Sequence, residues 1–422
     1  MAEWWLCGAH NPLSDEPDND VHLRDGQVVG TGRAPQDATR LNVHGLWILP
    51  VMADLSNRLR STRQLDHELS AAAKAGFGQV LILPDTQPVL DVPAQVTSFL
   101  ERARRSFPLD VHVVGAMTRA LEGKVLSNMA ALKGAGCFGV SQVRYPISSI
   151  ETLLRSFQYA ATHQLMVFIH PEEPSLAQGC VHEGLISTRL GLPGIPSTAE
   201  TVALAAQLLL VEQTGVRAHV GQVSTAGSVR LLAWAKQEGL PVTADVSIHH
   251  LLLTDAAIEG FDAMAHIRPP LRSERDRQSL CAAVDEGIID AIVSAHEPLE
   301  KSAKQAPFAA TTPGISAVDG FLSLAMSLVD KRLLALDSLI RALSSNPARI
   351  LSHEIPFLRS GDEASFLLYD TKAMWQLEPA SMNSQGHNTP YLHQSLQGQV
   401  CQVWLKGQPL LANPSFQQPK VF

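Results

Sequence analysis

The feature that most constrains this sequence is an alternation of short apolar runs with longer stretches of helical periodicity, which begins at residue 49. The apolar runs end near Arg58, Pro84, Ala116, Gln142, His170, Val223, Ser247 and Ala295. Helical patterns fill the gaps, at about 65–75, 95–106, 149–163, 197–214, 226–238, 274–286 and 317–330, with one more at about 335–345. This alternation predicts βα units around a parallel sheet, and the number of strands is the one that closes a (β/α)₈ barrel. Ser197 and Glu200 have the spacing of a capping box at the start of one helix.

Both ends of the chain have a different sequence pattern, which is typical of β-strands. Residues 1–48 contain short strand-like pieces broken by turn residues, and alternating runs return at about 365–369 and 399–408. The sequence therefore predicts a barrel over residues 49–351 and a small flanking β-sandwich, built from residues 1–48 and 352–422. A chain of 422 residues with 45% hydrophobic content can bury both cores.

Charge and cysteine usage exclude several classes of function. The formal net charge is −8 and no basic run occurs, which opposes binding to nucleic acid or to anionic membranes. No apolar window approaches the length of a membrane span. The five cysteines are scattered and form no C-x-x-C pair, so neither a disulfide framework nor a structural zinc site is indicated. We expect a cytoplasmic protein.

Polar residues follow the first barrel strand at every second position. Asp54, Ser56, Arg58 and Arg60 alternate with apolar or neutral residues. The period of two predicts that these side chains share one face of the strand, where a barrel strand ends at its active face.

Several separated motifs resemble those of the dihydroorotase family of cyclic amidohydrolases. The stretch 54–60 resembles its Asp-x-His-x-His-x-Arg strand, and 83–91 resembles its Pro-Asn-Thr-x-Pro loop. Further stretches at 169–173, 220–228, 242–254 and 267–272 extend the resemblance over nearly the whole chain. The resemblance implies an amidohydrolase-type barrel, in which zinc ligands at strand ends and a carboxylate that moves a proton hydrolyse a cyclic amide.

The chain departs from the family at most positions that carry this chemistry. The resemblance places Ser56, Arg58 and Gln222 where the family has histidines, Gln142 where it has a bridging carboxylate or carboxylated lysine, and Ala295 where it has the catalytic aspartate. His170 is the one retained ligand, and Leu299 replaces a further histidine. A guanidinium repels a cation by about 4 kcal/mol at ~4 Å and an effective dielectric constant of ~20, for one unit of the metal's charge. We therefore expect no zinc and no catalytic residue.

The substrate-binding positions are changed less uniformly. Arg60 matches the family's carboxylate-binding arginine, whereas Asp85 and Arg268 put charges at neutral polar positions. Arg60 and Asp85 are thus vestigial substrate-binding candidates. The alternative is that Arg60 pairs with Asp85 or Asp54 and fills old cavity space. Burying Arg58 and Arg60 together requires compensating acids, for which Asp54, Asp85 and Glu172 are candidates.

Histidines near the predicted strand ends offer a second route to a metal site. They are His170, His219, His249, His250 and His296. Adjacent side chains of an extended segment diverge, which disfavours His249 and His250 as joint ligands. We expect most of these residues to be hydrogen-bonded barrel histidines.

The resemblance then leads to three functional hypotheses. The first is an inactive dihydroorotase-like protein, similar to the non-catalytic dihydroorotase-like chains that assemble with the catalytic chain of aspartate transcarbamoylase. The second is a cyclic-amide hydrolase with a rebuilt or single-metal site. The third is a sensor that binds a carboxylated metabolite at Arg60. Bound metal distinguishes the first two, and ligand-induced stabilisation without turnover identifies the third.

Overall fold

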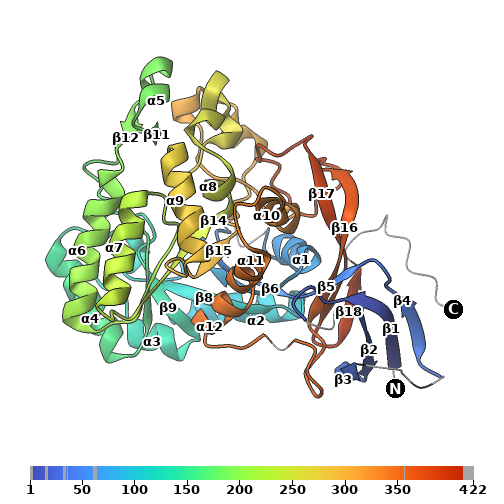
Figure 1. The fold of residues 1–422 in the computed structure, drawn as a ribbon. Coiled ribbons are helices and arrows are strands. Elements are labelled where there is room, and N and C mark those ends of the chain that lie inside the picture. Colours follow the sequence, from blue (N-terminus) through green and yellow to red (C-terminus); the bar gives the residue numbers. More distant parts are fainter. Residues whose placement is uncertain are drawn as a thin grey trace.

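The central part of the chain closes into a barrel. The computed structural model describes residues 3–14, 18–31, 35, 37–59, 64–355 and 357–411. Its eight-stranded parallel sheet follows the chain in the order β6 (Met52–Asn57), β7 (Phe77–Ile82), β8 (Asp110–Ala116), β9 (Cys137–Ser141), β10 (Met166–Ile169), β13 (Ala218–Val220), β14 (Val242–Ser247) and β15 (Ala291–Val293). Helices surround the sheet (Figure 1). The predicted (β/α)₈ barrel is confirmed.

The helices of the outer layer include all those predicted. They are α1 (Leu65–Ala75), α2 (Pro93–Ser106), α4 (Ile150–Thr162), α6 (Thr198–Thr214), α7 (Ala226–Gln237), α9 (Glu274–Asp285), α10 (Phe321–Asp330) and α11 (Leu336–Leu343). The short helices α3 (Met129–Gly134), α5 (Leu185–Leu190), α8 (Ile248–Leu252) and α12 (Ser345–Ile350) were not predicted. Their five or six residues span too few turns for periodicity to reveal them. A two-stranded excursion, β11 (Val181–His182) and β12 (Gly194–Ile195), carries α5.

Alternating side chains of the strands supply two cores. In β7 and β10, Val80 and Val167 pack into the main cluster beneath the helices, while their neighbours Leu81 and Phe168 belong to a separate cluster. A strand's period of two places these neighbours on opposite faces, so the second cluster fills the barrel interior. All four residues are at most 2% exposed. The barrel is a packed core and not a pore.

The barrel closes between its first and last strands. The Arg58 backbone N–H donates to the His296 carbonyl oxygen at 2.9 Å. The carboxylate of Asp54, which is 1% exposed, accepts the Ser294 backbone N–H at 3.1 Å and the Ser294 hydroxyl at 2.5 Å. Asp54 therefore links β6 to the end of β15 by hydrogen bonds.

This role of Asp54 corrects one prediction. The pairing of β6 with β7 shifts register between Asp54 and Asn57, where an extra residue interrupts the ladder. The bulge breaks the simple period of two. Asp54 therefore contacts Ser294 of the neighbouring strand and does not share the contacts of Ser56 and Arg58.

Strands from both ends of the chain form the flanking unit. They are β1 (Glu3–His10), β2 (Asp18–Arg24), β3 (Gln27–Thr31), β4 (Thr39–Asn42), β5 (Trp47–Pro50), β16 (Phe366–Gln376), β17 (Ser395–Leu405) and β18 (Gln408–Leu411). They pair in the order β18-β17-β16-β5-β1-β2-β3, with β4 on β1. Trp4 of β1 and Trp404 of β17 nevertheless touch, with ring centroids 5.5 Å apart. Strands three places apart in a flat sheet are ~14 Å apart, so this sheet folds over onto itself around a small core.

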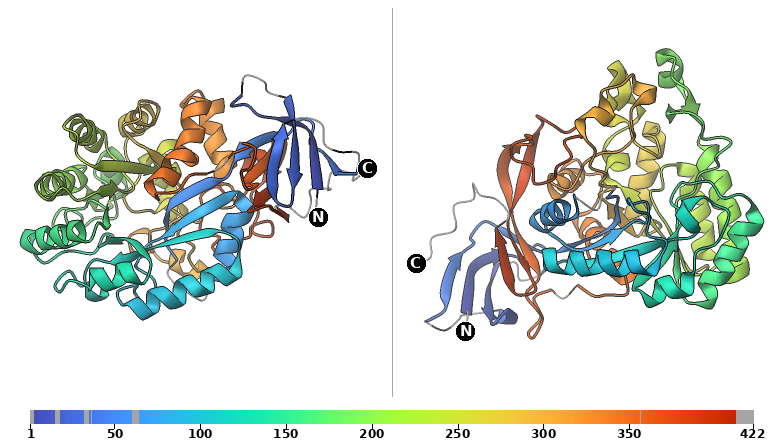
Figure 2. Two further views of the ribbon diagram at one scale, coloured as in Figure 1. Left: turned by 90° about the horizontal axis from the view of Figure 1, so that it is seen from below. Right: turned by 180° about the vertical axis from the view of Figure 1, so that it is seen from behind.

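The flanking unit stands to one side of the barrel, as Figure 2 shows. Helices α1 and α10 pack against β17 and join the two parts. The predicted domain boundaries fall inside β5 at residues 48 and 49, and just after α12 at residues 351 and 352. No helix in the described ranges is both long and apolar enough to cross a membrane.

The predicted capping box at Ser197 is wrong. The Ser197 side chain makes no capping hydrogen bond to α6. The carboxylate of Glu200 turns to the next loop, where it accepts the backbone N–H of Ser224 at 3.0 Å and the hydroxyl of Ser228 at 2.6 Å. A buried carboxylate with several donors outcompetes a local cap.

Asp54 makes the stability of the barrel depend on pH. Burial raises the pKa of Asp54 to about 6, although the hydrogen bonds from Ser294 act in the opposite direction. The pKa of an unfolded aspartate is ~3.9, so the folded chain binds more protons between about pH 4 and pH 6. The contribution of Asp54 to stability is therefore present below pH 4 and is lost as the pH rises through 6. Relative to Asp54→Asn, wild type should gain about 1 kcal/mol of unfolding free energy between pH 7 and pH 5.

Denaturant titrations of both proteins at the two pH values measure this difference. Asp66→Asn is the matched control, because Arg102 lowers the pKa of the exposed Asp66. Its stability difference should be small and change in the opposite direction. A pH-independent difference between wild type and Asp54→Asn contradicts the prediction.

A candidate site at the barrel mouth

The strand ends bring the positions singled out by sequence to one face of the barrel. Ser56 lies in β6. One residue beyond the ends of β6, β9 and β10 lie Arg58, Gln142 and His170, respectively, and Gln222 lies two residues beyond the end of β13. The Gln222 side-chain amide donates to the Ser56 hydroxyl at 2.8 Å, although the two residues are 166 positions apart. These two former ligand positions now hydrogen bond to each other across the mouth.

Arg58 is the central cation of this mouth. Its Nε donates to Asp85 Oδ2 at 3.0 Å, its Nη2 makes a second contact with the same oxygen, and its Nη1 donates to Glu297 Oε2 at 3.0 Å. The side chains of Arg58, Asp85 and Glu297 are 11%, 3% and 7% exposed. Burial by itself lowers the pKa of Arg58, but the two carboxylates override this effect and raise it. The guanidinium therefore stays charged and ties together the ends of β6, β7 and β15.

The prediction of which acids compensate the buried arginines is therefore only partly right. Asp85 pairs with Arg58, as one alternative allowed, and the unpredicted Glu297 is its second partner. Asp54 bonds to Ser294 instead, and Glu172 pairs with Arg268 through two hydrogen bonds of 2.7 and 2.8 Å. Arg60, the vestigial carboxylate-binding candidate, lies outside the described residues.

Arg144 is a second cation at the mouth, which sequence reasoning missed. It lies in the loop after β9, two residues beyond Gln142, and its Nη2 donates to Gln222 Oε1. Burial lowers the pKa of Arg144 to about 10, and the nearby charge of Arg58 acts in the same direction. The sequence feature that could have indicated Arg144 is its position in a strand-end loop, two residues after Gln142.

His170 lies close to both cations. It is 6% exposed, and Gly221 permits its imidazole to approach the end of β13, because a Cβ there would lie 3.0 Å from His170 Nε2. Burial lowers the pKa of His170 well below its ordinary value, and Arg144 and Arg58 lower it further. Nδ1 of His170 is buried without a hydrogen-bond partner in the part of the chain that the structure describes. The side chain is a neutral imidazole.

Gln142 has become part of the scaffold. Its Oε1 accepts the Thr118 hydroxyl at 2.8 Å, and its Nε2 donates to the Leu121 carbonyl oxygen at 2.8 Å. Both ends of the amide are therefore used in holding the loop that follows β8. This arrangement supports packing and supplies no anionic ligand.

Ala295 keeps an unusual backbone at the position of the expected proton carrier. Its φ is +48°, in the left-handed region that a non-glycine residue rarely adopts. Its methyl side chain cannot accept a proton. The next residue, His296, accepts the Ala317 backbone N–H at Nδ1 (3.1 Å), so its Nε2 carries the proton and donates to Glu68 at 3.0 Å.

The other histidines at the strand ends have structural partners. His219 contacts Asp245 at 2.8 Å and Thr243 at 2.8 Å. Asp245 also accepts the Gln222 backbone N–H at 2.7 Å, which secures a residue whose φ is +55°. His249 and His250 lie in the helix α8, not in an extended segment, and contact Tyr391 and Ser247.

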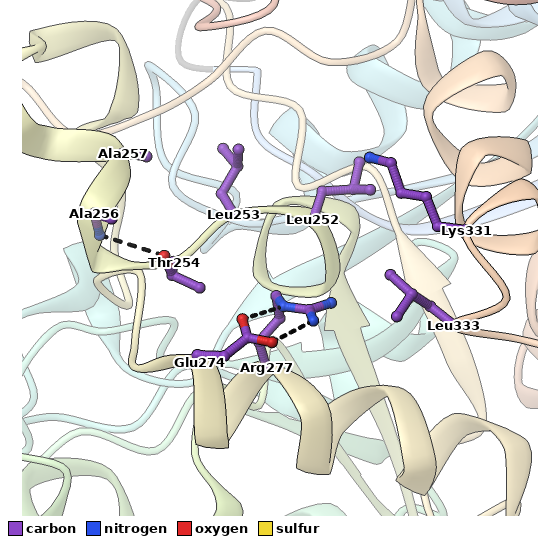
Figure 3. A pocket seen from close by; sticks show the side chains of 9 residues that line it. All are labelled: Leu252, Leu253, Thr254, Ala256, Ala257, Glu274, Arg277, Lys331 and Leu333. Carbon is purple, nitrogen blue, oxygen red and sulfur yellow. Dashed lines mark hydrogen bonds and ion pairs between the residues drawn. The ribbon is translucent and has the colours of Figure 1, made fainter.

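One surface groove lies away from these residues. It is a groove of about 660 Å³ between α8, the start of α9 and the end of α10 (Figure 3). Its charged residues Glu274 and Arg277 bind each other through two hydrogen bonds of 2.6 Å. Leucine and alanine side chains make up much of the remaining wall. This hollow offers no set of catalytic groups.

The donor set at the mouth does not fit a zinc ion. Structural and catalytic zinc sites use three or four Cys, His or carboxylate ligands. Among the described residues, no group of three or more His, Cys, Asp and Glu is arranged to hold a metal. The former ligand positions present a hydroxyl, a guanidinium and two amides around His170, and Arg144 adds a second positive charge. The expectation that the chain binds no zinc stays a prediction.

The charge cluster around Arg58 should be essential for folding stability. Arg58→Met removes the cation and leaves buried carboxylates, which typically costs about 3–5 kcal/mol. We expect the free energy of unfolding to fall by that amount in urea titrations. Arg155→Met is the matched control, since Arg155 lies on the exposed face of α4 and contacts Gln158. A loss below ~1 kcal/mol for Arg58→Met would show that the cluster does not stabilise the mouth.

Comparisons with known proteins agree with this architecture. Residues 42–228 match the family model described as "Dihydro-orotase-like". An L-hydantoinase (dihydropyrimidinase) from Arthrobacter aurescens has a similar fold, with a TM-score of 0.85 at 19% identity over 100% of this chain and 98% of that chain. A dihydropyrimidinase from Brevibacillus agri has a TM-score of 0.82 at 19% identity, over 99% and 96%. At this identity the likeness concerns the fold alone.

Sequence relatives are much closer. A dihydroorotase-like protein of Pseudomonas putida is 42% identical over 390 residues, which cover 90% of this chain and 92% of the relative. A dihydroorotase-like protein of Pseudomonas aeruginosa is 41% identical, over 92% and 94%. A protein named dihydroorotase from Syntrophus aciditrophicus is 35% identical, over 92% and 93%. By its barrel, its strand-end motifs and these relatives, the chain belongs to the dihydroorotase-like family.

Proposed function

We propose that this chain is a catalytically inactive dihydroorotase-like protein of the cytoplasm, which acts as a non-catalytic assembly subunit of aspartate transcarbamoylase in pyrimidine biosynthesis. The observation that carries inactivity is the guanidinium of Arg58, held by Asp85 and Glu297 where the resemblance places a metal ligand. A fixed cation at this point excludes a dication by charge and by space.

The lack of a proton carrier supports the same conclusion. Hydrolysis requires a base within hydrogen-bond reach of the attacking water. Position 295 is an alanine, and the neighbouring carboxylates are engaged: Asp54 by Ser294, Asp245 by His219 and Gln222, and Glu297 by Arg58. A hydrolase with a rebuilt site would have to break one of these contacts.

The assembly role rests on what the chain has kept. Its barrel packing and the flanking sheet are intact, while the mouth has lost its reactive groups. Selection on such a chain acts on the surface and not on the cavity. The non-catalytic dihydroorotase-like chains that it resembles offer the partner, the catalytic chain of aspartate transcarbamoylase.

Inactivity is tested on the purified chain and on one variant. We expect no carbamoyl-aspartate cyclisation or dihydroorotate hydrolysis, and less than one equivalent of zinc by elemental mass spectrometry. The double variant Ser56→His, Arg58→His should also be inactive, because positions 142, 222 and 295 still lack the required groups and such units are strongly non-additive. Stoichiometric zinc, together with turnover that His170→Ala abolishes, would overturn the proposal and favour the rebuilt hydrolase.

Assembly is tested by mixing this chain with an aspartate transcarbamoylase catalytic chain at micromolar concentration. We expect co-elution on gel filtration, which chelator treatment leaves unchanged because charge pairs and not a metal hold the strand ends. An active dihydropyrimidinase of the same fold serves as the control that should elute separately. Separate elution of this chain, with transferase activity the same in its presence and absence, contradicts the assembly role.

A further inference from the structure

An unassigned pocket connects the barrel mouth with the outer helices. It measures about 540 Å³ and lies between the loop after β9, the helix α4 and the helix α6. These two helices are neighbours in the outer layer (Figure 1). One part of the wall is polar and contains Arg144 and His170, and another is apolar and contains Phe157, Ala203 and Ala206. The pocket is therefore amphipathic.

Arg144 has unused hydrogen-bonding capacity in this pocket. A guanidinium carries five N–H donors. In the ranges that the structure describes, Arg144 makes one side-chain hydrogen bond, to Gln222, and forms no ion pair. Arg58 and Arg268, by contrast, are each bonded to carboxylates. Among the described residues, Arg144 is thus a cation of the mouth whose charge has no directly bonded anion.

Two residues of the pocket wall each have a buried polar atom without a hydrogen-bond partner in the part of the chain that the structure describes. The atoms are Nδ1 of His170, whose residue is 6% exposed, and Oε1 of Gln207 on α6. Buried polar atoms are nearly always hydrogen bonded, so each unpaired one requires an explanation. Both residues line the same pocket as Arg144.

The carboxylate of Glu172 also lies in the pocket wall, but its charge is compensated. Arg268 binds it through Nε and Nη2. Glu172 therefore does not neutralise Arg144 by direct contact. Glu173 is likewise engaged, since its carboxylate accepts the Ser175 hydroxyl at 2.6 Å.

We propose that this pocket binds an amphipathic monocarboxylate, with its carboxylate on Arg144 and its apolar body in the slot between α4 and α6. The guanidinium binds carboxylates in a planar, two-pronged arrangement. The phenyl and methyl groups of Phe157, Ala203 and Ala206 contact the hydrocarbon part. The proposal does not depend on the assembly role.

The experiment titrates the purified full chain with acetate, butanoate and octanoate by isothermal calorimetry, below any micellar concentration. The dissociation constant should fall roughly fourfold for each added methylene group that is buried. Arg144→Gln should weaken octanoate binding about tenfold or more, because a charge-assisted hydrogen bond is lost. Octan-1-ol, which lacks the charge, should bind wild type and this variant equally, and octylammonium should not bind.

A second variant tests the apolar slot without touching the charge. Ala206→Phe should weaken octanoate binding and leave acetate binding unchanged, because the ring occupies the space of the chain. Arg155→Gln and Ala205→Phe are the matched controls, since neither residue lines the pocket, and both should bind octanoate as wild type does. Binding that is independent of chain length, equal affinity of wild type and Arg144→Gln, or equal affinity for octylammonium would overturn the proposal. None of these outcomes affects the test with the transferase chain.

Discussion

The ion-pair cluster of Arg58 with Asp85 and Glu297 is the interaction on which the barrel mouth depends. It joins residues at the ends of three strands, and two of its members are 239 positions apart in the chain. A metal would hold such strand ends through ligand bonds, and here a permanent organic cation joins them by charge-assisted hydrogen bonds. Desolvation of the separated charges costs free energy when such a cluster forms. Removing one partner costs more, because a buried charge is then left uncompensated. This asymmetry explains why all three side chains are buried together.

Several other polar side chains of the mouth are also paired with each other. Asp54 holds Ser294, His296 holds Glu68, and Gln222 holds Ser56, each in surroundings from which water is excluded. A buried polar network stabilises a unique arrangement when its members are satisfied and destabilises it when they are not. In the part of the chain that the structure describes, Nδ1 of His170 and Oε1 of Gln207 are among several buried side-chain atoms without a hydrogen-bond partner, and Arg144 makes one side-chain hydrogen bond.

Two strand-end residues of the mouth have an unusual backbone conformation. Ala295 and Gln222 retain left-handed backbone conformations at strand ends, with φ of +48° and +55°. Such conformations cost free energy and occur mainly where the surrounding structure imposes them. At these two positions the chain has a methyl group and an amide, where the resemblance implies an aspartate and a histidine. A barrel of this kind keeps its outer surface, which is the part that an assembly partner would contact.

The sequence alone determined the architecture and the residue types at the strand ends, and the tertiary structure decided which charged side chains pair with each other. Periodicity is local, so the eight strands, the long helices and the β-rich ends were predictable, whereas helices of five or six residues were not. The grouping of the strand-end residues was also predictable, because the parallel barrel brings all carboxyl ends to one face. Sequence patterns did not predict the bulge in β6, the pairing of Arg58 with Glu297 or the pocket beside Arg144. Each depends on loop conformations and on contacts between residues far apart in the chain, which no local pattern records.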